Sequence, residues 1–225
     1  MMENSKQVYN GDKPKFFGRR KGRTIRKAKS FLLEDFLPKI LLKASAEICL
    51  ADCFSEPKNK YALEIGFGDG AHLAAISQSQ PDTGFVGVEV YKNGVANLLS
   101  LLTGVKEGNG EDLQNITLKD GYVDNVRVFD DDVRLLFSVL PAACFDKIYL
   151  LFPDPWPKKK HAGRRFVNPD NLKQLARLLK KGGILQIAAD HSVYKSWVLH
   201  TMAQDKNFVW TAKSSDDWRN PPADW

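Results

Sequence analysis

Cysteine and histidine are scarce in this sequence, whose 225 residues include three cysteines and four histidines. Cys49 and Cys53 are one helical turn apart, which is typical of the buried face of a helix, and Cys144 stands alone. No cysteine or histidine has the spacing of a zinc site, and an odd number of cysteines does not suggest a disulfide framework. We therefore expect neither a metal centre nor a disulfide-stabilised secreted domain.

Long apolar segments are also lacking. No run reaches the length of a membrane span, and the polar N-terminus has no apolar core typical of a signal peptide. The hydrophobic content of 43% is normal for a globular protein, and the length suits one large domain or one domain with an arm. We expect a cytoplasmic protein with no membrane partner. The sequence leaves open whether it is a monomer or a homodimer.

Positive charge is concentrated at the N-terminus. Residues 1–29 contain ten Lys or Arg and two acids, a net charge of +8, whereas the whole chain carries +6, so residues 30–225 carry −2. We interpret residues 1–29 as a flexible basic arm, which either binds nucleic-acid phosphates or is only a solubilising tail. We interpret residues 30–225 as a single domain that begins with a helical extension between Ser30 and Ile48, interrupted at Pro38.

Strand and helix patterns alternate along the rest of the chain. Short apolar runs predict strands at residues 61–65, 84–88, 126–129, 147–152 and 184–188, with another near 208–211. Helices are predicted at residues 71–76, 92–102, 169–179 and 192–203. We expect Gly182 and Gly183 to end the helix before them and residues 103–124 to form a surface insertion. The alternation predicts an α/β fold with a doubly wound, Rossmann-like parallel sheet.

Three glycines follow the first predicted strand. Gly66, Gly68 and Gly70 permit a tight turn and a close approach of the backbone to a ligand, at the N-terminus of a helix. They are candidate cofactor-binding residues, although the pattern also satisfies a loose dinucleotide fingerprint. Glu64 favours a positively charged ligand, such as a sulfonium or an ammonium, because a carboxylate there would repel a pyrophosphate. The alternative is that Glu64 only caps nearby amides.

Acids follow the next two strands as well. Glu89 lies about twenty residues after the glycine turn, where an acid typically accepts hydrogen bonds from the ribose of an adenosine-containing cofactor. Asp132 is the last of three consecutive acids, and we expect it to cap the next helical turn and to contact the ligand. Because no further ligand has suitable spacing, a metal site at these acids is disfavoured.

Residues 150–161 are the most distinctive stretch. Two prolines stop the fourth strand, and Asp154 lies between them. Trp156 is either the wall of a ligand pocket or part of the core. Asp190 closes the fifth strand. The cations after the tryptophan are either a solvated run or contacts to phosphates, and they include Lys158, Lys159, Lys160, Arg164 and Arg165.

The acids at the strand ends line one edge of the predicted sheet. A pocket of carboxylates suits S-adenosyl-L-methionine, because its sulfonium is cationic. The basic arm and the basic loop suit an anionic polymer. Together these features predict a methyltransferase that acts on a nucleic acid.

Four segments, residues 63–70, 87–90, 152–156 and 188–190, closely resemble the bacterial tRNA (guanine-N(7)-)-methyltransferase family. The resemblance implies a class I S-adenosylmethionine-dependent methyltransferase fold and methyl transfer to ring nitrogen seven of a guanine in tRNA. It implies a catalytic role for Asp154 and substrate contacts by Lys158 and Asp190. It also implies four acids that contact the cofactor: Glu64, Glu89, Asp132 and Asp154. The family has Thr where this chain has Ala189, and its pattern continues past residue 225 into a substrate-holding stretch that we expect this chain to lack.

The expected chemistry needs no general base, because ring nitrogen seven of guanine carries a free lone pair at neutral pH. Asp154 would hydrogen-bond the guanine and stabilise the positive charge that develops on it. Three alternatives stay open. A methyltransferase for another RNA base would use a similar motif. A nicotinamide-dependent oxidoreductase would share the glycine turn and Glu89 but not explain Glu64. A non-catalytic RNA-binding module would explain the cations but not the acidic strand ends.

Overall fold

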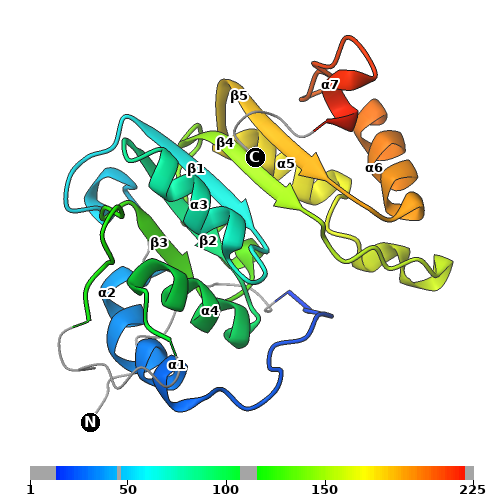
Figure 1. Ribbon diagram of the computed structural model, residues 1–225. Helices are drawn as coiled ribbons and strands as arrows, with labels where there is room; N and C mark the ends of the chain where they lie inside the picture. Colours follow the sequence, from blue (N-terminus) through cyan, green and yellow to red (C-terminus); the bar gives the residue numbers. More distant parts are fainter. Residues whose placement is uncertain (1–13, 45–46, 107–115, 221–225) are drawn as a thin grey trace.

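The fold is built on a five-stranded parallel sheet with the strand order β3-β2-β1-β4-β5 (Figure 1). The computed structural model describes residues 14–44, 47–106 and 116–220. The strands are β1 (Lys60–Ile65), β2 (Thr83–Val88), β3 (Val126–Phe129), β4 (Phe145–Leu151) and β5 (Leu179–Ala188). The strand order reverses beside β1, where the chain crosses from β3 to β4. Ligands of open α/β sheets bind at such a switch point, outside the carboxyl ends of the strands.

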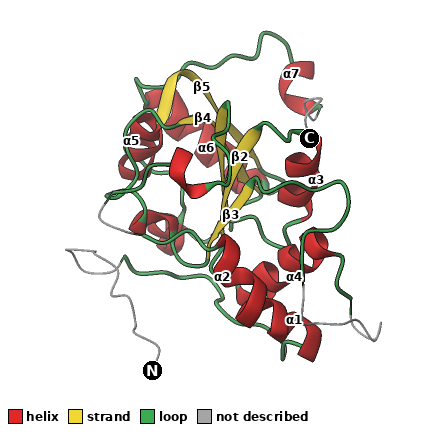
Figure 2. Ribbon diagram, turned by 90° about the vertical axis from the view of Figure 1, so that its left-hand side faces the viewer, coloured by secondary structure: helices red, strands yellow, loops and turns green. Residues whose placement is uncertain are grey.

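Helices cover both faces of the sheet. Figure 2 shows the sheet nearly edge-on, with α5 on one side and α3 and α4 on the other. One face carries α1 (Lys27–Phe31), a π-helical turn (Leu32–Phe36), α2 (Leu37–Ile40), α3 (Ala71–Ser79) and α4 (Lys92–Thr103). The other carries α5 (Pro169–Leu178) and α6 (Ser192–Gln204). Shorter elements are three 3₁₀ turns (Ala51–Cys53, Val133–Leu135, Lys159–Arg164) and α7 (Asp216–Arg219).

The two faces of the sheet have separate cores because side chains alternate along each strand. Leu63 and Ile148 lie in the cluster that includes residues of α5 and α6. Ala62 and Phe85 lie in the cluster that includes residues of α1 to α4. The Rossmann-like parallel fold predicted from the sequence is confirmed. None of the helices within the described ranges is long and apolar enough to cross a membrane.

The N-terminal helical extension is shorter than predicted. It ends at Ile40, because Leu41 has an extended backbone (ψ 122°) and forms a bridge to Val128 of β3. Pro38 does not interrupt the helix, since it lies in the first turn of α2, where its missing N–H is tolerated.

Two predictions near the C-terminus are wrong. Gly182 and Gly183 do not separate α5 from β5, because β5 already begins at Leu179 and contains both glycines. The ladder shifts register there, and Gly182 has a φ of +80° that glycine adopts easily. The strand predicted near residues 208–211 is absent from the sheet; Val209 is 86% exposed in this segment.

Other expectations also changed. Cys49 is exposed and precedes a 3₁₀ turn, so it does not belong to a buried helical face. Of the predicted insertion, residues 107–115 lie outside the described residues. Val105 and Ile116 on either side of them are buried in the core beside α4, so this segment is not wholly a surface insertion.

Candidate active site

The glycine turn has the backbone that only glycine adopts without strain. Gly66, Gly68 and Gly70 have φ values of 69°, 60° and 79°. A Cβ added at Gly66 or Gly68 would meet no atom within 4 Å, whereas one at Gly70 would lie 2.6 Å from Cβ of Leu98. The first two glycines therefore border open space, and the third allows α3 to pack closely against α4.

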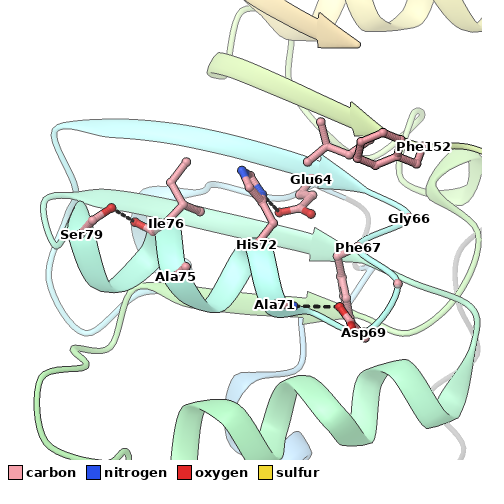
Figure 3. Close-up of a pocket in the computed structure, with 12 residues that line it drawn as sticks. Glu64, Gly66, Phe67, Asp69, Ala71, His72, Ala75, Ile76, Ser79 and Phe152 are labelled. Carbon is pink, nitrogen blue, oxygen red and sulfur yellow. Dashed lines mark hydrogen bonds and ion pairs between the residues drawn. The ribbon is translucent and has the colours of Figure 1, made fainter. Parts of the chain in front are cut away.

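Glu64 lies at the end of β1 with its side chain turned toward α3. It is 2% exposed, and its Oε2 lies 2.8 Å from Nδ1 of His72 (Figure 3). Burial raises the pKa of Glu64, and the hydrogen bond with His72 partly opposes this rise. Sequence reasoning missed His72. Its position as the second residue of the helix that begins at the glycine turn was the available signal.

Glu89 connects the end of β2 to the glycine turn. Its Oε2 accepts a hydrogen bond from the amide of Gly68 at 2.8 Å, and its Oε1 accepts one from the amide of Tyr91 at 2.8 Å. Burial raises the pKa of Glu89, these backbone bonds lower it, and the charge of Asp154 raises it further. Glu89 thus fixes the turn and lies within electrostatic reach of Asp154.

Asp132 caps a helical turn, as predicted. Its side chain accepts a hydrogen bond from the amide of Arg134 at 3.0 Å, and its Oδ2 lies 2.6 Å from Nη2 of the same residue. Nη2 of Arg134 also donates to the carbonyl of Lys15 at 3.0 Å. The carboxylate is therefore already paired with a guanidinium and lies below a segment of the N-terminal arm.

A cavity of about 730 Å³ opens at the glycine turn. It extends along α3 and is lined by Glu64, Gly66, Phe67, Gly68, Asp69, Ala71, His72, Ala75, Ile76, Ser79, Leu151 and Phe152. Its volume is within the range of sites for small ligands. Figure 3 shows Glu64 and His72 pointing toward each other, with Phe152 nearby at the end of β4. Glu89, Asp132 and Asp154 are outside this lining, so the structure does not gather all the predicted acids around one cavity.

The loop after β4 has an unusual backbone around Asp154. Phe152 and Trp156 have φ values of 49° and 40°, a left-handed conformation that is costly for residues other than glycine. Asp154 itself is exposed. Trp156 is partly buried, and its ring contacts the rings of Phe17 and His161 edge-on, with centroids 6.4 Å and 5.7 Å apart. Trp156 is thus part of an aromatic surface beside Asp154.

The cations after this motif lie in two different environments. Lys158 is exposed, and the guanidinium of Arg164 stacks on Phe17 and Trp156, 4.6 Å and 4.9 Å from the ring centroids. Arg165 is buried, with 6% exposure, and donates to the carbonyls of Pro155 and Trp156. It therefore does not lie on the loop surface where a phosphate contact was predicted. Asp190 is exposed just after β5.

The described part of the arm lies along this edge of the sheet (Figure 1, blue). Residues 14–26 have no helix or strand, but Nη1 of Arg20 lies 2.8 Å from Oδ1 of Asp131. The amide of Gly22 donates to Oδ1 of Asn93 at 2.9 Å. Among the described residues, no group of three or more His, Cys, Asp or Glu is placed to hold a metal ion.

Comparisons with known proteins show which family this chain is related to. A sequence family described as "Putative methyltransferase" matches residues 58–224. A curated protein of Agrobacterium fabrum is 42% identical over 212 residues, which are 93% of this chain and 84% of the relative. Its counterpart in Rhodospirillum rubrum is 37% identical over 94% of this chain and 78% of the relative. Both are named tRNA (guanine-N(7)-)-methyltransferase. This chain belongs to that family.

The resemblance to tRNA (guanine-N(7)-)-methyltransferases seen in the sequence is thus confirmed. Among solved structures, the 16S rRNA methyltransferase KamB matches with 14% identity and a TM-score of 0.43 over 65% of this chain and 68% of that one. The aminoglycoside resistance methyltransferase NpmB1 matches with 20% identity and a TM-score of 0.41 over 65% and 64%.

Proposed function

We propose that this protein transfers a methyl group from S-adenosyl-L-methionine to ring nitrogen seven of a guanine in tRNA. Membership of the tRNA (guanine-N(7)-)-methyltransferase family supports this activity. The single structural observation that supports this activity is the glycine turn. The side chain of Glu89 holds the turn through the amide of Gly68, and the turn borders a cavity whose wall includes the buried carboxylate of Glu64. We also propose that the protein acts in the cytoplasm, on tRNA, and has no membrane partner.

The residues at this edge suit a cationic methyl donor. The cavity borders Gly66 and Gly68, where no atom would contact an added Cβ, so the backbone is open to a ligand. A carboxylate as buried as Glu64 gains most from a positively charged partner, because few waters solvate it. We assign cofactor contacts to Glu64, Gly66 and Gly68, which line the cavity. We also assign them to four residues outside that lining: Gly70, Glu89, Asp132 and Asp154. The donor, when bound, supplies an electrophilic methyl group.

The protein's own part in the reaction is positioning and electrostatics. A guanine can attack with its ring nitrogen seven without prior loss of a proton, and this attack leaves positive charge on the purine. Asp154 accepts hydrogen bonds from the guanine and stabilises this charge. Holding the nitrogen in line with the methyl group lowers the activation barrier by on the order of 7–11 kcal/mol. Lys158 and Arg164 contact tRNA phosphates, and Asp190 contacts the substrate.

The decisive experiment maps the methylated nucleotide. The full chain is incubated with tRNA that lacks this modification and with methyl-labelled S-adenosyl-L-methionine. Borohydride reduction and aniline treatment then cleave the RNA at 7-methylguanine. We expect label in the tRNA and cleavage at a guanine. Label without such cleavage would point to another base. Binding of a nicotinamide cofactor without binding of S-adenosyl-L-methionine would favour an oxidoreductase instead.

A further inference from the structure

Arg165 is a charged residue in a place that a phosphate cannot reach. Only 6% of its surface is exposed, whereas its neighbour Arg164 is partly exposed. Its Nε donates to the carbonyl of Pro155 at 3.2 Å, and its Nη2 donates to the carbonyl of Trp156 at 3.0 Å. Burying a cation is unfavourable unless it is well hydrogen-bonded. Here one guanidinium holds two consecutive carbonyls directly after Asp154.

The backbone that Arg165 holds is strained. Trp156 has a φ of 40°, which a tryptophan adopts only when its surroundings impose it. Such strain is concentrated at functional sites, where it serves to aim a side chain. The two carbonyl contacts of Arg165 are made to this backbone, at the two residues that immediately follow Asp154.

Arg165 is itself fixed from several sides. Its amide donates to the carbonyl of Ala162 at 3.1 Å, and its carbonyl accepts from Nδ2 of Asn168 at 3.2 Å. Its guanidinium lies 4.6 Å from the ring centroid of Trp197 on α6. Nε1 of Trp197 donates to the carbonyl of Val167 at 2.7 Å. A continuous set of contacts therefore links α6 to the Asp154 loop.

Arg165 and Asp154 act on one shared region. Both charges influence the phenol of Tyr194, a buried residue of α6, although burial is the main cause that raises the pKa of Tyr194 to about 12. The hydroxyl of Tyr194 also accepts a hydrogen bond from the amide of Val167 at 3.4 Å.

We propose that Arg165 is a positioning residue, which fixes the Asp154 loop through the carbonyls of Pro155 and Trp156 and does not bind tRNA itself. This inference rests on the proposed function. Only an arginine has the rigid fork of donors that reaches two adjacent carbonyls at once, so lysine is not an equivalent replacement.

The test compares Arg165→Lys with Arg177→Lys. Arg177 is a matched control because its Nη1 donates to the carbonyl of Leu140 at 3.0 Å and its Nη2 donates to that of Phe137, beside the amino-terminal ends of β4 and β5. We expect Arg165→Lys to lower kcat by about 10- to 100-fold, because small misplacements of reacting groups have effects of this size. The KM for tRNA should stay within about twofold and its salt dependence should not change, because no phosphate contact is lost. Arg177→Lys should leave kcat within about twofold.

A raised KM with a shallower salt dependence and an unchanged kcat would identify Arg165 as a phosphate contact and overturn the inference. So would equal kcat losses in the two variants. If Arg165→Lys does not fold, Trp197→Leu decides, because it removes the ring that packs on the Arg165 guanidinium and changes no residue of the Asp154 loop. We expect the loosened guanidinium to lower kcat, and an unchanged kcat would refute the proposal. The wild-type chain must form 7-methylguanine in the same assay, and its failure to do so would count against the proposed function instead.

Discussion

The carboxylate of Glu64 lies 2.8 Å from Nδ1 of His72, across the start of the cavity beside the glycine turn. The acid comes from the end of β1 and the histidine from the first turn of α3. The acid is 2% exposed, and burial raises its pKa in spite of the histidine. The folded protein therefore binds a proton at Glu64 more tightly than the unfolded chain does.

This linkage predicts a pH-dependent stability difference for Glu64→Gln. The folded state gains stability from binding a proton at Glu64 more tightly than the unfolded chain does. This stability is fully present below the ordinary pKa of 4.5 and is lost as the pH rises through the raised pKa of the folded protein. Glutamine has no group that titrates in this pH range, so it does not have this pH-dependent stability. The free energy of unfolding of Glu64→Gln minus that of wild type should therefore be higher at pH 8 than at pH 4. The increase should be about 1.4 kcal/mol for each unit by which the folded pKa of Glu64 exceeds the unfolded one, and urea unfolding at both pH values measures it. A difference that is the same at both pH values would contradict the assigned shift.

Two of the three glycines in the turn are expected to show different costs when replaced by alanine. Gly70→Ala combines a φ of +79° with a Cβ 2.6 Å from Leu98, and should lower the free energy of unfolding by about 2–5 kcal/mol. Gly66→Ala has a φ of +69° but open space around its Cβ, and should cost only about 1–2 kcal/mol. Its methyl group projects into the ligand space, so calorimetry should show weaker binding of S-adenosyl-L-methionine. Equal losses of stability would refute this distinction.

Asp154→Asn isolates the charge of the proposed catalytic carboxylate. We expect kcat to fall by about 10²–10³, the usual effect of removing one preorganised electrostatic partner of the transition state. The free energy of unfolding should stay within about 0.5 kcal/mol, because Asp154 is exposed. Single-turnover methyl transfer to tRNA measures the rate, and urea unfolding is the control. A folded variant with a near wild-type rate would remove Asp154 from the mechanism.

Lys158→Ala should weaken tRNA binding in a salt-dependent way. Each lost phosphate contact makes the slope of log affinity against log salt shallower by about 0.7–0.9. Lys180→Ala is the matched control, because Lys180 lies at the start of β5 with its Nζ 2.8 Å from Oδ2 of Asp146, away from the edge that carries Asp154. Filter binding at several salt concentrations gives both slopes. The same slope for Lys158→Ala and wild type would show that Lys158 does not contact a phosphate.

Local sequence patterns were enough to identify the five strands of the sheet and the edge that carries the site, although they also predicted a strand near residues 208–211 that is absent. Apolar runs, the glycine turn and the prolines act over a few residues, so they fixed where β1 and β4 end and where Glu64 and Asp154 stand. Asp132 could be predicted as a cap because its partner, the amide of Arg134, is two residues away. The end of the helical extension at Ile40 could not be predicted in this way, because it depends on the bridge between Leu41 and Val128, which are far apart in the sequence.

The sequence by itself thus determined the order of the elements, the glycine turn and the family, while the tertiary structure decided which side chains meet. Arg164 and Arg165 are adjacent and chemically identical, yet one stacks on Phe17 and the other is buried beneath the Asp154 loop. The physical reason is that periodicity encodes the ends and faces of elements. The choice of partners, such as Arg165 with Trp197, is made by packing between segments far apart in the chain.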